Sequence, residues 1–183
     1  MAKYGWLLDL KRCIECRACE SACKQWNHVE TGVGVRYRIV HTSETGVYPK
    51  ITTQAASLAC NHCDDYWCGK VCPTGAIGRR SSDGIVLIDQ QKCIGCRMCE
   101  KFCPYQVPKY NPSTRKTEKC TMCADRIDSG LAPACATLCP TEALQWGEWE
   151  EISKHGSPFA PGFTDPKYTH PNIRFIVEGW PAK

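Results

Sequence analysis

Short apolar runs, rather than long periodic ones, dominate the pattern of hydrophobic positions along the chain. The runs at 6–10 (WLLDL) and 85–89 (IVLID) each lead into a cluster of cysteines, and both are typical of strands. The polar, glycine-bounded stretch 78–84 (GRRSSDG) precedes the second run, so residues 77–89 predict a hairpin. No apolar run approaches the roughly 20 residues that a membrane-spanning helix needs.

Two stretches without cysteine lie outside this pattern. Residues 24–59 contain one alternating segment at 36–40 (RYRIV), which predicts a strand, and we interpret the rest as a linker or cap. Residues 149–183 are rich in proline and predict an irregular arm with one short strand at 173–177. Because the arm is too apolar and aromatic for plain disorder, we expect it to pack on this chain or on a partner subunit.

The 16 cysteines of the 183-residue chain fall into four groups of four, with none left over. In chain order the groups are Cys13, Cys16, Cys19 and Cys23; Cys60, Cys63, Cys68 and Cys72; Cys93, Cys96, Cys99 and Cys103; and Cys120, Cys123, Cys135 and Cys139. Groups one and three follow C-x2-C-x2-C-x3-C, the spacing that bacterial ferredoxins use for [4Fe–4S] clusters. Group two widens one gap to four residues and group four widens it to eleven.

The spacing has a physical reason. Three cysteines in a tight loop can surround one face of a cubane, whereas the fourth cysteine starts a new direction of chain and ligates the neighbouring cluster. Proline follows the last cysteine of groups two, three and four, where its fixed φ helps to hold that turn. Clusters should therefore come in pairs that exchange their fourth ligands.

The flanking segments predict which groups pair. The hairpin at 77–89 joins groups two and three, while group four exits into 140–146 (PTEALQW), a sequence of the same type as PTGAI after group two. Group one is preceded by a run of the same type as the one before group three, so groups one and four should pair. We predict an α+β fold of two ferredoxin-like two-cluster units, one inserted within the other, plus an irregular C-terminal arm.

The predicted boundaries follow from this pairing. Residues 1–23 and 119–148 form the outer unit, 24–59 the linker or cap, 60–118 the inner unit and 149–183 the arm. The predicted sites are a first (Cys13, Cys16, Cys19, Cys139), a second (Cys120, Cys123, Cys135, Cys23), a third (Cys60, Cys63, Cys68, Cys103) and a fourth (Cys93, Cys96, Cys99, Cys72).

Zinc, disulfides and nucleic-acid binding account less well for this composition. Group four alone, C-x2-C-x11-C-x3-C, could hold structural zinc. Groups one and three, however, each place three cysteines within seven residues, which is not a usual spacing for zinc ligands. A disulfide scaffold needs an oxidising compartment, and the sequence shows no secretory signal. The formal charge of +4 suggests nucleic acid, yet no nucleic-acid motif accompanies it. The thiolates of four bound clusters would add a charge of about −8, which would give the cluster-loaded chain a net charge of about −4.

Four segments resemble the iron–sulfur subunits of the dimethyl sulfoxide reductase type. They are CIECRACESACK (13–24), CNHCDDYWCGKVCPTGAI (60–77), CIGCRMCEKFCPY (93–105) and KCTMCADRIDSGLAPACATLCPTEAL (119–144). The family's crossed ligation carries over at all sixteen cysteines. Some relatives replace one cysteine of the third group with Trp and carry a [3Fe–4S] centre; here Cys96 is present, so the resemblance implies four [4Fe–4S] clusters.

The resemblance also implies partners. Such subunits bind a large molybdenum or tungsten pterin catalytic subunit and exchange electrons with a quinone-reactive membrane anchor or, beside tungsten aldehyde oxidoreductases, a flavoprotein. We therefore expect a non-catalytic electron-transfer subunit of an oxidoreductase, with a free-standing polyferredoxin as the alternative. No catalytic motif is visible in the sequence. Without an export signal we expect a cytoplasmic location, or the periplasmic side if a twin-arginine partner carries the protein there.

Overall fold

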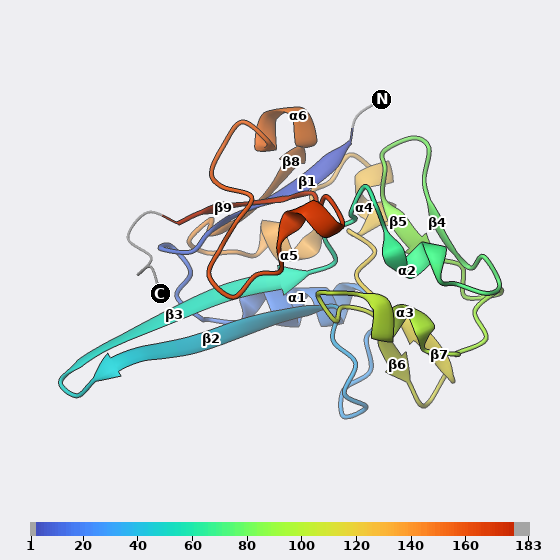
Figure 1. The fold of residues 1–183 in the computed structure, drawn as a ribbon, viewed down its shortest axis with the longest axis horizontal. Helices are drawn as coiled ribbons and strands as arrows, with labels where there is room; N and C mark the ends of the chain where they lie inside the picture. The colour runs from blue at the N-terminus through green and yellow to red at the C-terminus, as the bar shows by residue number, and fades with distance from the viewer. Residues whose placement is uncertain (1–2, 178–183) are drawn as a thin grey trace.

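The centre of the computed structural model, which describes residues 3–177, is a three-stranded sheet (Figure 1). Its strands, in sheet order, are β8 (Leu144–Glu148), β1 (Tyr4–Asp9) and β9 (Ile173–Ile176). β1 runs antiparallel to β8 and parallel to β9. The strand predicted in the arm is thus confirmed, and it packs on this chain.

Three two-stranded hairpins accompany the sheet. They are β2 (Arg38–Val47) with β3 (Lys50–Ala59), β4 (Ile77–Arg79) with β5 (Val86–Ile88), and β6 (Lys109–Asn111) with β7 (Lys116–Glu118). The β4–β5 pairing confirms the hairpin predicted at 77–89. The β2–β3 hairpin is far longer than the strand predicted at 36–40, and its outer half projects from the body (Figure 1).

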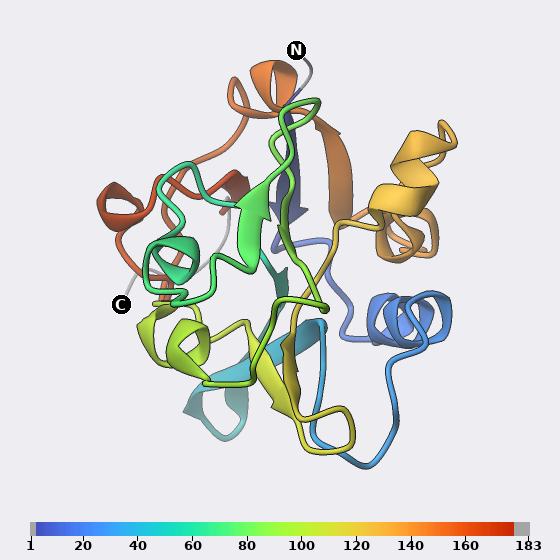
Figure 2. The same cartoon turned by 90° about the vertical axis from the view of Figure 1, so that its right-hand side faces the viewer.

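The helices are short. They are α1 (Ala18–Trp26), α2 (Trp67–Lys70), α3 (Met98–Phe102), α4 (Ala124–Asp128) and α5 (Ala134–Thr137), followed in the arm by α6 (Trp149–Ile152) and the 3₁₀ helix η1 (Pro166–Tyr168). Helices α1 to α5 contain or directly follow cysteines. Helices this short are not stable in isolation, so packing must hold them. α1 packs with α5 and α2 with α3, and Figure 2 shows the two pairs on opposite sides of the molecule.

The hydrophobic core lies where the central sheet meets the β2–β3 and β4–β5 hairpins. Its most deeply buried side chains include Trp6 and Leu8 of β1, Ile85 beside β5, and Phe175 of β9. Cysteines of groups one and four belong to the same cluster of packed residues. The sheet therefore supports the cysteine loops directly. None of the helices in the described range is long and apolar enough to cross a membrane.

Candidate metal centres

Left-handed backbone turns give groups one and three the same local shape. Arg17 and Arg97, which follow the second cysteine of each run, have φ of 58° and 62°. The residues before that cysteine, Glu15 and Gly95, also have positive φ, of 59° and 67°. These repeated left-handed residues curl each run into a tight loop, and α1 or α3 begins at once after it. The C-x2-C-x2-C spacing of these two groups therefore corresponds to a tightly curled loop followed by a helix.

Two cavities combine cysteines from different groups. One is lined by Cys60, Cys63 and Cys68 of group two together with Cys103 of group three. The other is lined by Cys93, Cys96 and Cys99 of group three together with Cys72 of group two. The structure therefore brings together the residues predicted for the third and fourth sites. Iron binding by these sets stays a prediction.

The cysteines of groups one and four also lie near one another. Burial raises the pKa of Cys13, and the charges of Cys139 and Cys16 raise it further. Burial likewise raises the pKa of Cys23, and the nearby Cys120, Cys135 and Cys123 add to that effect. The neighbours of Cys13 and of Cys23 are those predicted for the first and second sites. Iron ligands must be deprotonated, so thiols with raised pKa values have to release their protons when a metal binds.

Hydrogen-bond donors point at several of the sulfurs. Backbone N–H groups of Met122, Leu144 and Thr117 donate to Cys120, Cys139 and Cys93 over 3.3, 3.4 and 3.5 Å, and the Asn27 side chain lies 3.7 Å from the Cys123 sulfur. Donors of this kind favour the thiolate form and tune the potential of a bound cluster. Sequence reasoning missed these residues, because their donors come from loops and strands that the cysteine spacing does not single out.

No set of three or more His, Cys, Asp or Glu among residues 3–177 converges closely enough to hold a single metal ion. Two of the cysteine sets instead line cavities, as ligands that each hold a different iron of one cluster would. A [4Fe–4S] cluster, with one thiolate for each of its four irons, fits this donor arrangement.

The buried imidazole of His62 supports that fit at the third site. Its Nδ1 accepts a hydrogen bond from the Val86 N–H over 3.0 Å, and burial lowers the pKa of His62 well below its ordinary value. The neutral ring must then carry its proton on Nε2, which finds no hydrogen-bond partner among the described residues. His62 lines the cavity of Cys60, Cys63, Cys68 and Cys103. A cluster bound in this cavity would supply sulfur atoms that can accept a hydrogen bond from the free Nε2–H of His62.

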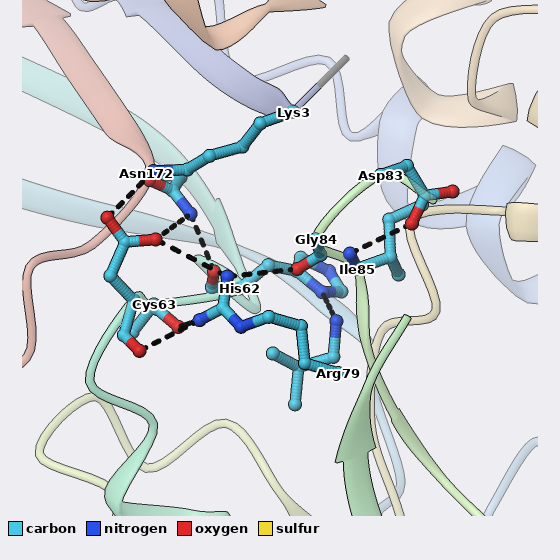
Figure 3. Close-up of polar contacts among 10 residues, drawn as sticks. Lys3, His62, Cys63, Arg79, Asp83, Gly84, Ile85 and Asn172 are labelled. Atoms are coloured by element: carbon cyan, nitrogen blue, oxygen red, sulfur yellow. Dashed lines mark hydrogen bonds and ion pairs between the residues drawn. The ribbon is translucent and has the colours of Figure 1, made fainter. Parts of the chain in front are cut away.

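Three elements tie down the group-two loop, as Figure 3 shows. The guanidinium of Arg79, on β4, donates to the carbonyl oxygens of Cys63 and Asp64. Asn172, just before β9, donates to the His62 carbonyl oxygen over 2.7 Å. With the Val86 contact from β5, the loop is held from both the inner hairpin and the arm. The positions of the third-site cysteines are therefore fixed by residues distant in sequence.

Lys119 is a buried cation beside two sites. Its ammonium donates to the carbonyl oxygens of Val86 and Cys120, and the residue lines the cavity of the third site. Burial raises the pKa of Cys68 to about 12, and the Lys119 charge opposes that rise. A fixed positive charge here favours the anionic ligands that a cluster needs.

Paired cysteine loops, short helices and small hairpins around multi-cysteine cavities define an iron–sulfur protein of the ferredoxin type. The 4Fe-4S dicluster domain family matches residues 51–149, and a 4Fe-4S binding domain matches residues 10–30. The sequence is 38% identical over 181 residues to a probable anaerobic dimethyl sulfoxide reductase chain, YnfG, of Escherichia coli, covering 93% of this chain and 87% of YnfG. It is 36% identical over 186 residues to an anaerobic dimethyl sulfoxide reductase chain of Haemophilus influenzae, covering 94% and 88%.

A third relative, the thiosulfate reductase electron transfer subunit PhsB of Salmonella typhi, is 41% identical over 150 residues, covering 81% of this chain and 78% of PhsB. This protein belongs to the family of iron–sulfur subunits of the dimethyl sulfoxide reductase type, which confirms the resemblance seen in the motifs. It is an electron-transfer subunit that binds several [4Fe–4S] clusters.

Proposed function

We propose that the chain relays single electrons through four [4Fe–4S] clusters within a multi-subunit molybdenum or tungsten pterin oxidoreductase. One end of the relay is the large catalytic subunit, and the other is a quinone-reactive membrane anchor or a flavoprotein. The observation that carries the proposal is that the 16 cysteines form four groups of four along the chain, with none left over, and that cysteines of different groups lie near one another. A chain that served one or two clusters would leave cysteines without a role.

The proposed ligand sets are crossed between paired groups. The first site is Cys13, Cys16, Cys19 and Cys139, the second Cys120, Cys123, Cys135 and Cys23, the third Cys60, Cys63, Cys68 and Cys103, and the fourth Cys93, Cys96, Cys99 and Cys72. The cavities support the last two sets, and the neighbours of Cys13 and Cys23 support the first two.

We also propose that the two-cluster units are nested, the inner within the outer. The antiparallel pairing of β1 with β8 joins the segments before group one and after group four, as β4 with β5 does for groups two and three. Packing of α1 with α5 and of α2 with α3 follows the same division. Two separate units in chain order would instead pair groups one with two and three with four.

The chain's own residues have a limited part in this function. Bound clusters would supply one-electron chemistry, while the protein would hold them by thiolates and donate hydrogen bonds to the sulfurs. The relatives named as dimethyl sulfoxide or thiosulfate reductase proteins differ in substrate, so the substrate belongs to the catalytic partner. This chain would determine how readily each electron moves, and not which compound is reduced.

Purification of the untagged protein from its native source without oxygen tests the proposal. We expect about sixteen irons and sixteen sulfides per chain, four of each for every cluster, and co-elution with a large pterin-containing subunit. Zinc without sulfide would refute the cluster assignment. Full iron content in a protein that elutes alone would instead favour the free-standing polyferredoxin over the subunit.

A further inference from the structure

Arg38, the first residue of β2, is a charged residue buried between the proposed first and second sites. Only 3% of it is exposed, and its guanidinium lies 4.5 Å from the centroid of the Trp6 ring. Nη1 donates to the carbonyl oxygen and to Oγ of Ser57, over 2.9 and 3.2 Å. Nε and Nη2 find no hydrogen-bond partner among residues 3–177. A buried charge whose Nε and Nη2 carry three free N–H groups is costly unless an anion lies beside it.

The groups around Arg38 that would become anions on binding iron are cysteine sulfurs of the proposed first and second sites. Burial alone would lower the pKa of Arg38, but the charges of Cys135, Cys120, Cys19 and Cys23 outweigh burial and raise it. Cys19 belongs to the proposed first site and the other three to the second. Ser57 links the guanidinium to one of them, because its Oγ also lies 3.1 Å from the Cys19 sulfur. Arg38 therefore faces two proposed sites at once.

We propose that Arg38 is the shared counter-cation of the first and second sites, a positioning residue that raises the reduction potentials of both clusters together. The inference rests on the proposed function, because it takes the two cysteine sets as cluster ligands. A cluster that accepts one electron gains one negative charge, and no bond or proton need change. A fixed positive charge in a buried, low-dielectric position stabilises the more negative state. Sharing one cation would keep both outer clusters reducible despite their mutual repulsion.

The rival hypothesis is that Arg38 only fastens the β2–β3 hairpin through Ser57 and Trp6. That role needs one hydrogen-bonding nitrogen and contact with the Trp6 ring, and it needs no anion nearby. It leaves the free N–H groups of Nε and Nη2 and the surrounding sulfurs unexplained. Reduction potentials separate the two hypotheses, because a merely structural contact would not move them while the clusters stay intact.

The test compares variants of the full chain prepared without oxygen, with iron content and a redox titration followed by electron paramagnetic resonance. Arg38→Gln removes the charge, and Arg38→Lys keeps it. Arg36→Gln is the matched control, because Arg36 has 48% of its side chain exposed and pairs with Glu20 over 3.6 Å. We expect Arg38→Gln to lower two of the four potentials, changing the ratio of oxidised to reduced cluster at least tenfold at a fixed poise, about 59 mV for one electron.

Arg38→Lys should shift the same two potentials by much less, and Arg36→Gln should shift none. If Arg38→Gln loses iron but Arg38→Lys loads fully with nearly unchanged potentials, the charge is needed to hold the clusters, which also supports the proposal. Full loading of Arg38→Gln with four unchanged potentials would overturn it, and so would loss of iron in both Arg38 variants. The wild-type protein is measured before any variant. If it does not hold four clusters, that result overturns the proposed function and not the role of Arg38.

Discussion

At the scale of single residues, the backbone of the cysteine loops explains why equivalent positions carry different amino acids. Glu15 and Gly95 occupy the same place in groups one and three, both with positive φ. Glu15 accepts that conformation with its side chain held by Thr42, over 2.5 Å, and by Arg17, over 3.1 Å. No side chain fits at position 95 without a shift, because a Cβ there would lie 2.2 Å from the carbonyl oxygen of Arg115.

Replacing Gly95 with Ala should therefore destabilise the fourth site. The left-handed backbone strain and the collision with Arg115 together should cost about 1–3 kcal/mol, since the turn between β6 and β7 must move away. Gly75→Ala is the matched control: its φ is also positive, at 63°, but open space surrounds its Cβ position, so only about 1 kcal/mol of strain is expected. The temperature at which visible cluster absorbance bleaches measures both. Equal bleaching temperatures for the two variants would contradict the proposed collision.

Residue-level prediction from sequence could use the spacing of residues, which is local, but not their burial. The cysteine groups are local patterns, so their neighbours in space could be predicted from loop length and strand type. Arg38 lies in an alternating segment whose charged positions would ordinarily face water. Only the packing of Trp6 and the cysteines around it, which the local sequence does not encode, shows that this charge is buried.

At the scale of elements, the β2–β3 hairpin divides into a structural inner half and a solvent-exposed outer half. Val40, Ala55, Ser57 and Ala59 of the inner half are buried. The outer half is exposed on both strands, and its polar sequence lacks the hydrophobic alternation that predicts a strand. This is why only residues 36–40 could be predicted as strand, although pairing continues from Arg38↔Ala59 to Val47↔Lys50.

Shortening this hairpin should leave the clusters intact. Replacing residues 43–54 with Asn-Gly would close a tight turn on the Thr42↔Ala55 pair and keep every buried residue of the hairpin. We expect full iron content and a bleaching temperature within about 4 °C of wild type, which corresponds to less than about 1 kcal/mol. As a contrast, Val40→Asp places an unpaired charge in the inner half and should lose iron. Iron loss in the shortened protein would show that the outer half supports the sites.

At the scale of the whole molecule, the central sheet joins strands from distant parts of the chain. The strands before group one and after group four pair as their matching sequences predicted, with Trp6 opposite Trp146. The parallel addition of β9 on the other side of β1 was not predictable, because a four-residue strand carries no signal for a distant parallel partner. The arm thus completes the central sheet, and its residues 178–183 lie outside the described range.

The proposed exchange of fourth ligands between the paired groups can be tested directly. In Cys23→Ala the proposed second site loses one ligand, so iron should fall from about sixteen to about twelve per chain. The three cysteines released are expected to be Cys120, Cys123 and Cys135, since burial and these same neighbours raise the pKa of Cys23. Anaerobic alkylation followed by peptide mass spectrometry identifies which thiols have been freed.

Cys139→Ala is the reciprocal variant, because Cys139 lies beside Cys13 although it belongs to group four. It should free Cys13, Cys16 and Cys19 and leave Cys120, Cys123 and Cys135 protected. The two variants together distinguish a lost ligand from general unfolding, which would free both sets in each. Alkylation of Cys13, Cys16 and Cys19 in Cys23→Ala would mean that each group holds its own cluster. The crossed arrangement would then be wrong, even with the same sixteen cysteines bound to iron.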